Sequence, residues 1–177
     1  SSAASDVYKR QALVLLLKVE NLTYEADKRT ILNNINLNIE KGDTIAVIGP
    51  SGSGKSTLFK QLNNLISPTE GELYLDGKNY NDYSPEELRS RVSYLMQQSG
   101  LIGSTIEHNM KFPCEARGDK FDREKAKQLI KQVGLGDYDL DAEIEHMSGG
   151  ERQRITIARQ LMYEPEVLLL DLSLIHI

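Results

Sequence analysis

Residues 49–57, which read GPSGSGKST, have the types and the spacing that bind a phosphate group. They match the pattern G-x-x-x-x-G-K-[ST]. Glycine permits the backbone angles and the close approach that such a loop needs, and successive N–H groups then surround the β-phosphate. The lysine can bridge the β- and γ-phosphates, and the first hydroxyl after it can ligate Mg²⁺. An ordinary turn is the alternative, but the full spacing favours a nucleotide site that comprises Gly49, Pro50, Ser51, Gly52, Ser53, Gly54, Lys55, Ser56 and Thr57.

A second segment, residues 147–154, reads MSGGERQR and begins a predicted helix. The N-terminus of a helix presents free N–H groups and a positive dipole to an anion. Downstream, the hydrophobic run 167–171 ends in Asp171, and a carboxylate that ends a buried strand can hold Mg²⁺, usually through water. A strand-terminal Asp that caps a turn is the alternative to this metal site.

In this order the segments resemble those of the ATP-binding cassette (ABC) family, the ATPases of membrane transporters. The resemblance covers nearly all of residues 16–171. It implies binding of ATP and Mg²⁺, and ATP hydrolysis between two such subunits arranged head to tail. The signature segment of one subunit would contact the ATP of the other. This segment departs from the commonest form, Leu-Ser-Gly-Gly-Gln, at Met147 and at its last position, and its expected contact residues are Ser148, Gly149, Gly150 and Glu151.

The resemblance assigns three further roles. Asp171 matches the Mg²⁺ ligand of the second nucleotide motif. Gln97, at the end of a predicted strand, matches the glutamine whose amide oxygen joins the Mg²⁺ shell, although Gln98 beside it leaves the assignment open. Tyr24 lies where the family places an aromatic ring that stacks on adenine, and packing of this ring on the core is the alternative.

The residue after Asp171 is Leu172, where the family has a glutamate that polarises the attacking water. Leucine cannot accept a proton or orient water. Either the chain is a natural inactive variant or its native sequence stops at Asp171. In both cases we expect the chain as written to be inactive, and if the chain is cut just after Asp171 we expect the parent protein to be an ATPase.

The two ends of the chain favour the second interpretation. Residues 6–11, DVYKRQ, can be encoded by GAT GTG TAT AAG AGA CAG, and the reverse complement of that DNA encodes LSLIHI, which is residues 172–177. An adaptor joined to both ends of a DNA fragment explains such an inverted repeat, whereas chance does so poorly. We therefore expect residues 1–11 and 172–177 to be non-native, and residues 12–171 to be an incomplete ATP-binding domain.

The resemblance implies an α/β fold of the P-loop NTPase class, C-terminally truncated, in which a RecA-like parallel sheet is joined to an antiparallel β region and a helical signature subdomain. The subdomain is expected over about residues 99–146. A compact apolar strand at 44–48, of the kind that is buried on both faces of a parallel sheet, should lead into the phosphate loop. Strands are further expected at 16–24, 31–39, 72–77, 92–96 and 167–171, and helices at 56–65, from 84, at 122–133 and at 149–163.

Composition limits the function. The charge of −5 argues against broad binding of nucleic acid. A single cysteine excludes an internal disulfide, and no run is long enough to span a bilayer. The resemblance implies a cytoplasmic protein on the inner face of the membrane, paired with a second ATP-binding subunit and a transmembrane permease. The alternatives are a soluble ABC ATPase that is not tied to transport and, for this chain, a non-catalytic fragment. Residues 92–94, 103–106 and 111–113 resemble those of a bacterial group assigned to metal (iron) export.

Overall fold

The computed structural model describes residues 15–97 and 100–172. The chain divides into two compact units, Ser1–Arg89 and Ser90–Ile177, and each is described by itself. Of the segments expected to be non-native, residues 1–11 and 173–177 lie outside the described residues, as does Gln98. Leu172 is the last described residue and is exposed.

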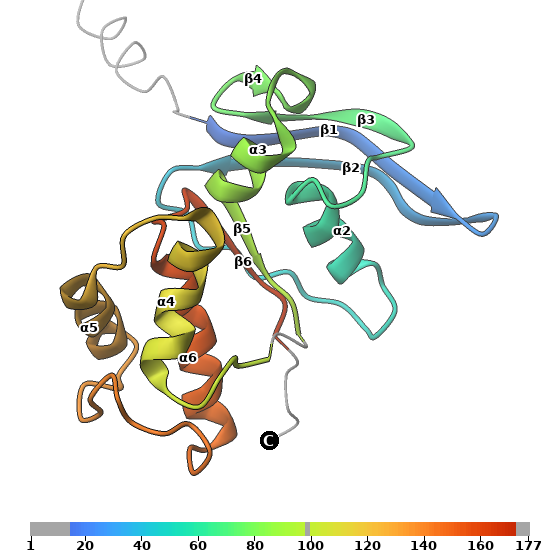
Figure 1. Ribbon diagram of the computed structural model, residues 1–177. Helices are drawn as coiled ribbons and strands as arrows, with labels where there is room; N and C mark the ends of the chain where they lie inside the picture. The colour runs from blue at the N-terminus through green and yellow to red at the C-terminus, as the bar shows by residue number, and fades with distance from the viewer. Residues whose placement is uncertain (1–14, 98–99, 173–177) are drawn as a thin grey trace, which may run out of the picture. The chain divides into compact units, whose positions relative to one another are not determined.

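The first unit contains a four-stranded antiparallel sheet (Figure 1). Strand β1 (Leu15–Ala26) and β2 (Arg29–Glu40) form a long hairpin, and β3 (Glu70–Leu75) and β4 (Lys78–Asn79) complete the order β2-β1-β3-β4. Alternation of side chains along β1 places Leu17 and Val19 in the core. An irregularity in the pairing between Val19 and Leu22 brings Leu22 into the core as well. The expected antiparallel β region is therefore confirmed.

Three short helical elements belong to this part of the chain: α2 (Lys55–Leu62), the 3₁₀ turn η1 (Tyr80–Asp82) and α3 (Pro85–Arg91). The Tyr80 hydroxyl donates to the carbonyl oxygen of Leu62 at 2.8 Å, and so satisfies an acceptor at the end of α2. The Ser84 hydroxyl accepts from the amide of Glu87 at 3.1 Å. The capped helix start that the sequence predicts at Ser84 is thus present.

The prediction of a buried strand at 44–48 is wrong for this structure. These residues form no strand, and Ile45, Val47 and Ile48 are 46, 37 and 89% exposed. A short strand is held by hydrogen bonds to its neighbours, and no strand among the described residues pairs with this segment. Local β propensity without a partner strand does not produce a strand.

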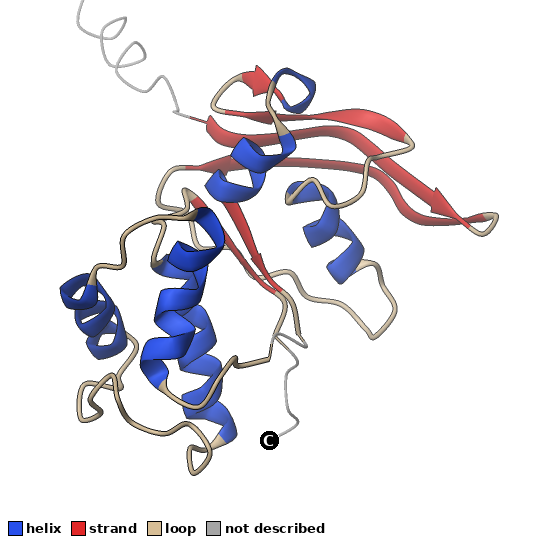
Figure 2. Cartoon of the chain, in the orientation of Figure 1, coloured by secondary structure: helices blue, strands red, loops and turns tan. Residues whose placement is uncertain are grey.

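The second unit combines a two-stranded parallel sheet, β5 (Val92–Leu95) with β6 (Val167–Leu170), and three helices (Figure 2). The helices are α4 (Ile106–Arg117), α5 (Arg123–Gln132) and α6 (Gly149–Leu161). They enclose an apolar core to which Ile106, Ile130 and Ile155 contribute fully buried side chains. This is the helical subdomain that the sequence predicts. Among the described residues, no helix combines the length and the apolar character needed to cross a bilayer.

Helices α5 and α6 begin where their capping residues predict. The Asp122 carboxylate accepts from the amide of Lys125 at 3.0 Å, and Ser148 caps α6 in the same way. Helix α4 was not predicted as a separate element. Its buried positions include the polar Asn109 and its interior contains Pro113, so its apolar periodicity is weak in the sequence.

Candidate functional site

The predicted phosphate loop is closed on itself by its own lysine. The Lys55 ammonium donates to the carbonyl oxygens of Gly49 at 2.7 Å and Pro50 at 2.8 Å, and lies 3.5 Å from the Ser53 hydroxyl. No carboxylate within the described residues forms an ion pair with this lysine. Its ammonium group is therefore hydrogen-bonded to neutral oxygens, and its positive charge stays available to an anion.

Backbone conformation explains why glycine is required in this loop. Gly52 and Gly54 have φ values of 79° and 91°, in the region that favours glycine. A Cβ atom on Gly54 would also lie 3.0 Å from the carbonyl oxygen of Ile31 on β2. Helix α2 begins immediately after Gly54, so its free N–H groups and positive dipole face the loop. Ser56 and Thr57 lie in its first turn and are half-buried.

Tyr24 belongs to the same unit as the phosphate loop. It is half-buried on β1 and lies opposite Leu32 of β2. A Cβ atom on Gly54 would meet the Leu32 side chain at 3.0 Å. Tyr24, the predicted adenine-stacking residue, is therefore the cross-strand partner of Leu32, which packs against Gly54 of the phosphate loop.

Gln97 and Asp171 lie together at one edge of the second unit. Leu95 and Leu170 are paired in the parallel sheet, and the amide of Asp171 continues the ladder by donating to the Leu95 carbonyl oxygen at 3.0 Å. Gln97 follows Leu95 by two residues in an exposed turn. Both polar side chains thus follow the carboxyl ends of adjacent parallel strands, the edge at which α/β proteins bind ligands.

Tyr94 is a site residue that no motif in the sequence indicates. Its hydroxyl donates to the Asp171 carboxylate at 2.9 Å. Burial, followed by the hydrogen bond to Asp171, raises the pKa of Tyr94, so this hydroxyl remains protonated at neutral pH. The alternation of side chains along Val92–Leu95 indicates that Tyr94 lies on the face opposite to Ser93 and Leu95. Its partner, however, is 77 residues away in the sequence.

The signature segment starts α6 with a reciprocal cap. The Ser148 hydroxyl accepts from the amide of Glu151 at 3.3 Å, and the Glu151 carboxylate accepts from the amide of Ser148 at 2.8 Å and from its hydroxyl at 2.7 Å. The Tyr138 hydroxyl donates to the same carboxylate at 2.7 Å. These hydrogen bonds lower the pKa of Glu151 to about 2, and the bond from the Ser148 hydroxyl makes the largest contribution.

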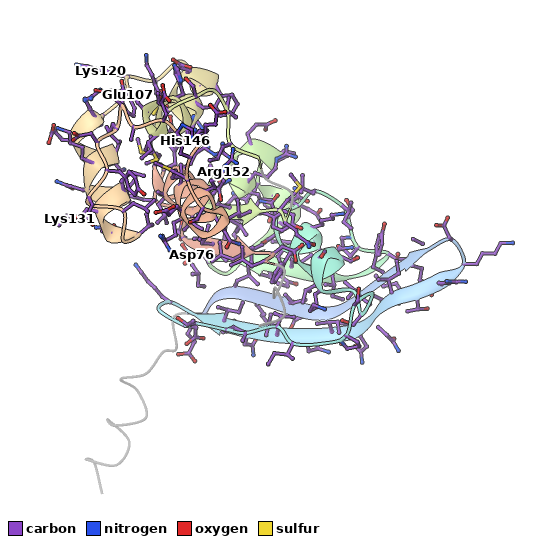
Figure 3. The ribbon with its side chains drawn as sticks, turned by 90° about the horizontal axis from the view of Figure 1, so that it is seen from below. Asp76, Glu107, Lys120, Lys131, His146 and Arg152 are labelled. Carbon is purple, nitrogen blue, oxygen red and sulfur yellow. The ribbon has the colours of Figure 1, made fainter. Side chains whose placement is uncertain are left out.

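Gly149 and Gly150 form the first turn of α6 and are exposed. No heavy atom lies within 4 Å of a Cβ built on Gly149, so this face of the helix N-terminus is open to an approaching group. Figure 3 shows the side chains and labels His146 and Arg152, which flank this segment in the sequence.

The oxygen-bearing side chains that were predicted as metal ligands suit Mg²⁺ better than a metal ion that is coordinated by protein atoms alone. Among the described residues, no group of three or more His, Cys, Asp and Glu side chains can hold a metal ion. Mg²⁺ is typically bound by one or two carboxylates together with water and substrate phosphates. In the second unit, the Asp171 carboxylate and the Gln97 amide are consistent with this chemistry, and in the first unit the Ser56 hydroxyl is so by itself.

Comparison with known proteins identifies the family. The family model described as ABC transporter matches residues 32–172. The chain belongs to the ABC transporter family. The resemblance predicted from the ordered motifs is therefore confirmed.

Two curated ABC relatives are similar over 88% of this chain. The probable iron export ATP-binding protein FetA of Escherichia coli is 41% identical, and the match spans 69% of its length. The choline transport ATP-binding protein OpuBA of Bacillus subtilis is 40% identical, and the match spans 42% of its length. The chain thus spans between two fifths and about two thirds of these relatives.

Solved ABC structures confirm the fold class. The structure of CbiO1 from Clostridium perfringens, part of the ABC transporter complex CbiONQ, has a TM-score of 0.78 and 31% identity. It covers 88% of this chain, which spans 64% of CbiO1. A bacterial Atm1-family ABC exporter with ATP bound has a TM-score of 0.77 and 28% identity, over 88% of this chain and 28% of the exporter. The α/β P-loop class, with its antiparallel β region and helical subdomain, is common to them.

Proposed function

We propose that this chain is the ATP-binding subunit of an ABC transporter, which binds ATP and Mg²⁺ and pairs with a second ATP-binding subunit. The observation that carries the proposal is the loop at 49–57, closed by Lys55 and followed directly by the N-terminus of α2. Ser148, Gly149 and Gly150 would contact the ATP of the partner subunit, since they form the open N-terminus of α6. By the family resemblance, Asp171 and Gln97 of the second unit and Ser56 of the first are each proposed as ligands of Mg²⁺.

A transmembrane permease is the proposed membrane partner, which places the working protein at the inner, cytoplasmic face of the membrane. Two similar proteins are described as parts of transport systems: CbiO1 of the complex CbiONQ, and the energy-coupling factor transporter ATP-binding protein EcfA1 of Mycoplasmopsis synoviae. We propose iron export as the transport process because FetA, described as a probable iron export protein, is matched over 69% of its length. A gene for a FetA-type membrane partner beside the native gene is the expected observation.

Nucleotide binding is tested by Lys55→Ala. Removal of the ammonium group is expected to weaken ATP binding about tenfold or more, because a hydrogen bond to a charged group contributes about 1.5–3 kcal/mol. Titration of the purified chain with a fluorescent ATP analogue, with and without Mg²⁺, measures this. Lys60→Ala is the matched control, since Lys60 is an exposed lysine in the last turn of the same helix. Equal affinities for both variants and the wild type would contradict the proposal.

The chain as written is proposed to bind ATP without turning it over. Leu172 follows Asp171 and offers no carboxylate to polarise the attacking water. Phosphate release from Mg-ATP is expected to stay at the background rate of buffer. Release that depends on Mg²⁺ and disappears in Lys55→Ala would refute this part of the proposal.

A further inference from the structure

Asp171 is held at two points before any ligand binds. Its backbone amide donates to the Leu95 carbonyl oxygen at 3.0 Å. Its Oδ2 atom accepts from the Tyr94 hydroxyl at 2.9 Å. Tyr94 is fixed in turn, because it lies opposite Leu169 within the parallel pair β5 and β6.

The Tyr94 hydroxyl uses only one of the acceptor positions of the Asp171 carboxylate. A carboxylate group has two oxygens and about four acceptor positions, and Tyr94 takes one of them on Oδ2. Among the described residues, no hydrogen bond to the Oδ1 atom is present, so Oδ1 can face a cation or a cation-bound water. A tyrosine hydroxyl suits this task because it remains a neutral donor at neutral pH and adds no charge that would repel a metal ion.

We propose that Tyr94 is a positioning residue for magnesium: by holding Oδ2 of Asp171, its hydroxyl presents Oδ1 to the ion that accompanies ATP. The inference rests on the proposed function, in which Asp171 is a magnesium ligand. It adds a residue that the ordered motifs do not include. Tyr94 does not contact the ion and acts through Asp171.

The benefit of such a contact is orientation. The terminal torsion of an aspartate side chain is broad, so a carboxylate without a partner points in many directions. Partners of metal ligands restrict that freedom, and their removal typically weakens metal binding by about 10 to 100 times. For one neutral hydrogen bond to a ligand that acts through water, we expect the low end of that range.

The experiment follows the Asp171 carboxyl carbon directly. The full chain is labelled with ¹³C at aspartate Cγ, the Asp171 signal is assigned with Asp171→Asn, and MnCl₂ is added without nucleotide. Bound Mn²⁺ broadens the signal of the carboxylate that it approaches. In Tyr94→Phe, the Mn²⁺ concentration that halves the Asp171 signal is expected to rise about tenfold.

Tyr163→Phe is the matched control. The Tyr163 hydroxyl donates to an Asp119 carboxylate oxygen at 2.6 Å in the same unit, so this variant removes an equivalent tyrosine–aspartate bond elsewhere. It is expected to leave the Asp171 response within twofold of the wild type. Thermal unfolding of every variant checks that the sheet is intact, and Tyr94→His, which keeps a ring N–H donor, is expected to recover part of the response.

The outcomes separate this inference from the proposed function. A Tyr94→Phe response within twofold of the wild type, an equal loss in Tyr163→Phe, or no broadening of Asp171 in the wild type would overturn it. ATP binding in EDTA is measured in parallel and is expected to be unchanged in Tyr94→Phe. Should the wild type bind no ATP while the Mn²⁺ difference persists, the proposed function fails and the positioning role stands.

Discussion

At the scale of single residues, Glu151 shows how one substitution is accommodated. The commonest form of the signature has glutamine at this position. Here the carboxylate accepts from the Ser148 amide and hydroxyl and from the Tyr138 hydroxyl, and these donors hold its pKa near 2. The glutamate therefore works as a charged N-terminal cap of α6 in a position where the helix dipole favours an anion.

This arrangement predicts a pH-dependent effect of Glu151→Gln. Because the folded pKa lies below the ordinary value of 4.5, the charged carboxylate stabilises the fold above about pH 4.5, and that stabilisation is lost as the pH falls toward 2. The variant is expected to have a lower urea midpoint than the wild type at pH 7, and the difference should shrink steadily below pH 4.5. A difference that does not vary with pH would contradict this. Glu145→Gln, at an exposed position before the helix, serves as the control.

At the scale of elements, a buried polar network ties the segment after Gln97 to two helices. The Asn109 side chain on α4 accepts from the Ile102 amide at 2.8 Å and donates to the carbonyl oxygens of Ile102 and Thr105 at 2.9 Å. Arg159 on α6 donates to the same Asn109 oxygen and to the Gly100 carbonyl oxygen, each at 3.2 Å. The helix that carries the signature is thereby joined to the loop 100–105.

The network predicts coupling between Asn109 and Arg159. Asn109→Ala is expected to lower the free energy of unfolding by about 1–3 kcal/mol, because it leaves buried groups without partners. Combined with Arg159→Met in a double-mutant cycle, it should show an interaction of at least about 0.5 kcal/mol in urea unfolding. Asn33→Ala, at an exposed position on β2, should stay within about 0.5 kcal/mol of the wild type. Additive effects of the two buried substitutions would contradict the network.

The same scale shows which elements a sequence can predict. Helices α5 and α6 were predictable because Asp122 and Ser148 mark their starts and apolar residues recur at helical spacing. Helix α4 was not, because the fully buried Asn109 takes a position where an apolar residue would have completed the pattern. From the sequence alone, a polar residue is predicted to be exposed. The partners that allow Asn109 to be buried lie in the loop 100–105 and on α6, and the sequence does not show them.

At the scale of the whole molecule, the order of the motifs predicted the family and the fold class, since each motif is local in the chain. The Tyr94–Asp171 bond was beyond reach, because it joins residues 77 positions apart. The prediction of a strand at 44–48 was wrong because it too depends on residues that are distant in the sequence. Its composition is local, whereas the hydrogen bonds that would make it a strand depend on a distant partner.

The exposed segment 44–48 has a practical consequence for handling the protein. A solvent-facing stretch with Ile45, Val47 and Ile48 presents exposed apolar side chains on backbone that pairs with no described strand, the combination that seeds cross-β stacking between molecules. Pro50 ends the stretch and limits its length, as gatekeeper prolines do. Solutions of the chain should be kept dilute, since crowding would favour intermolecular β-sheet and turbidity over the monomer.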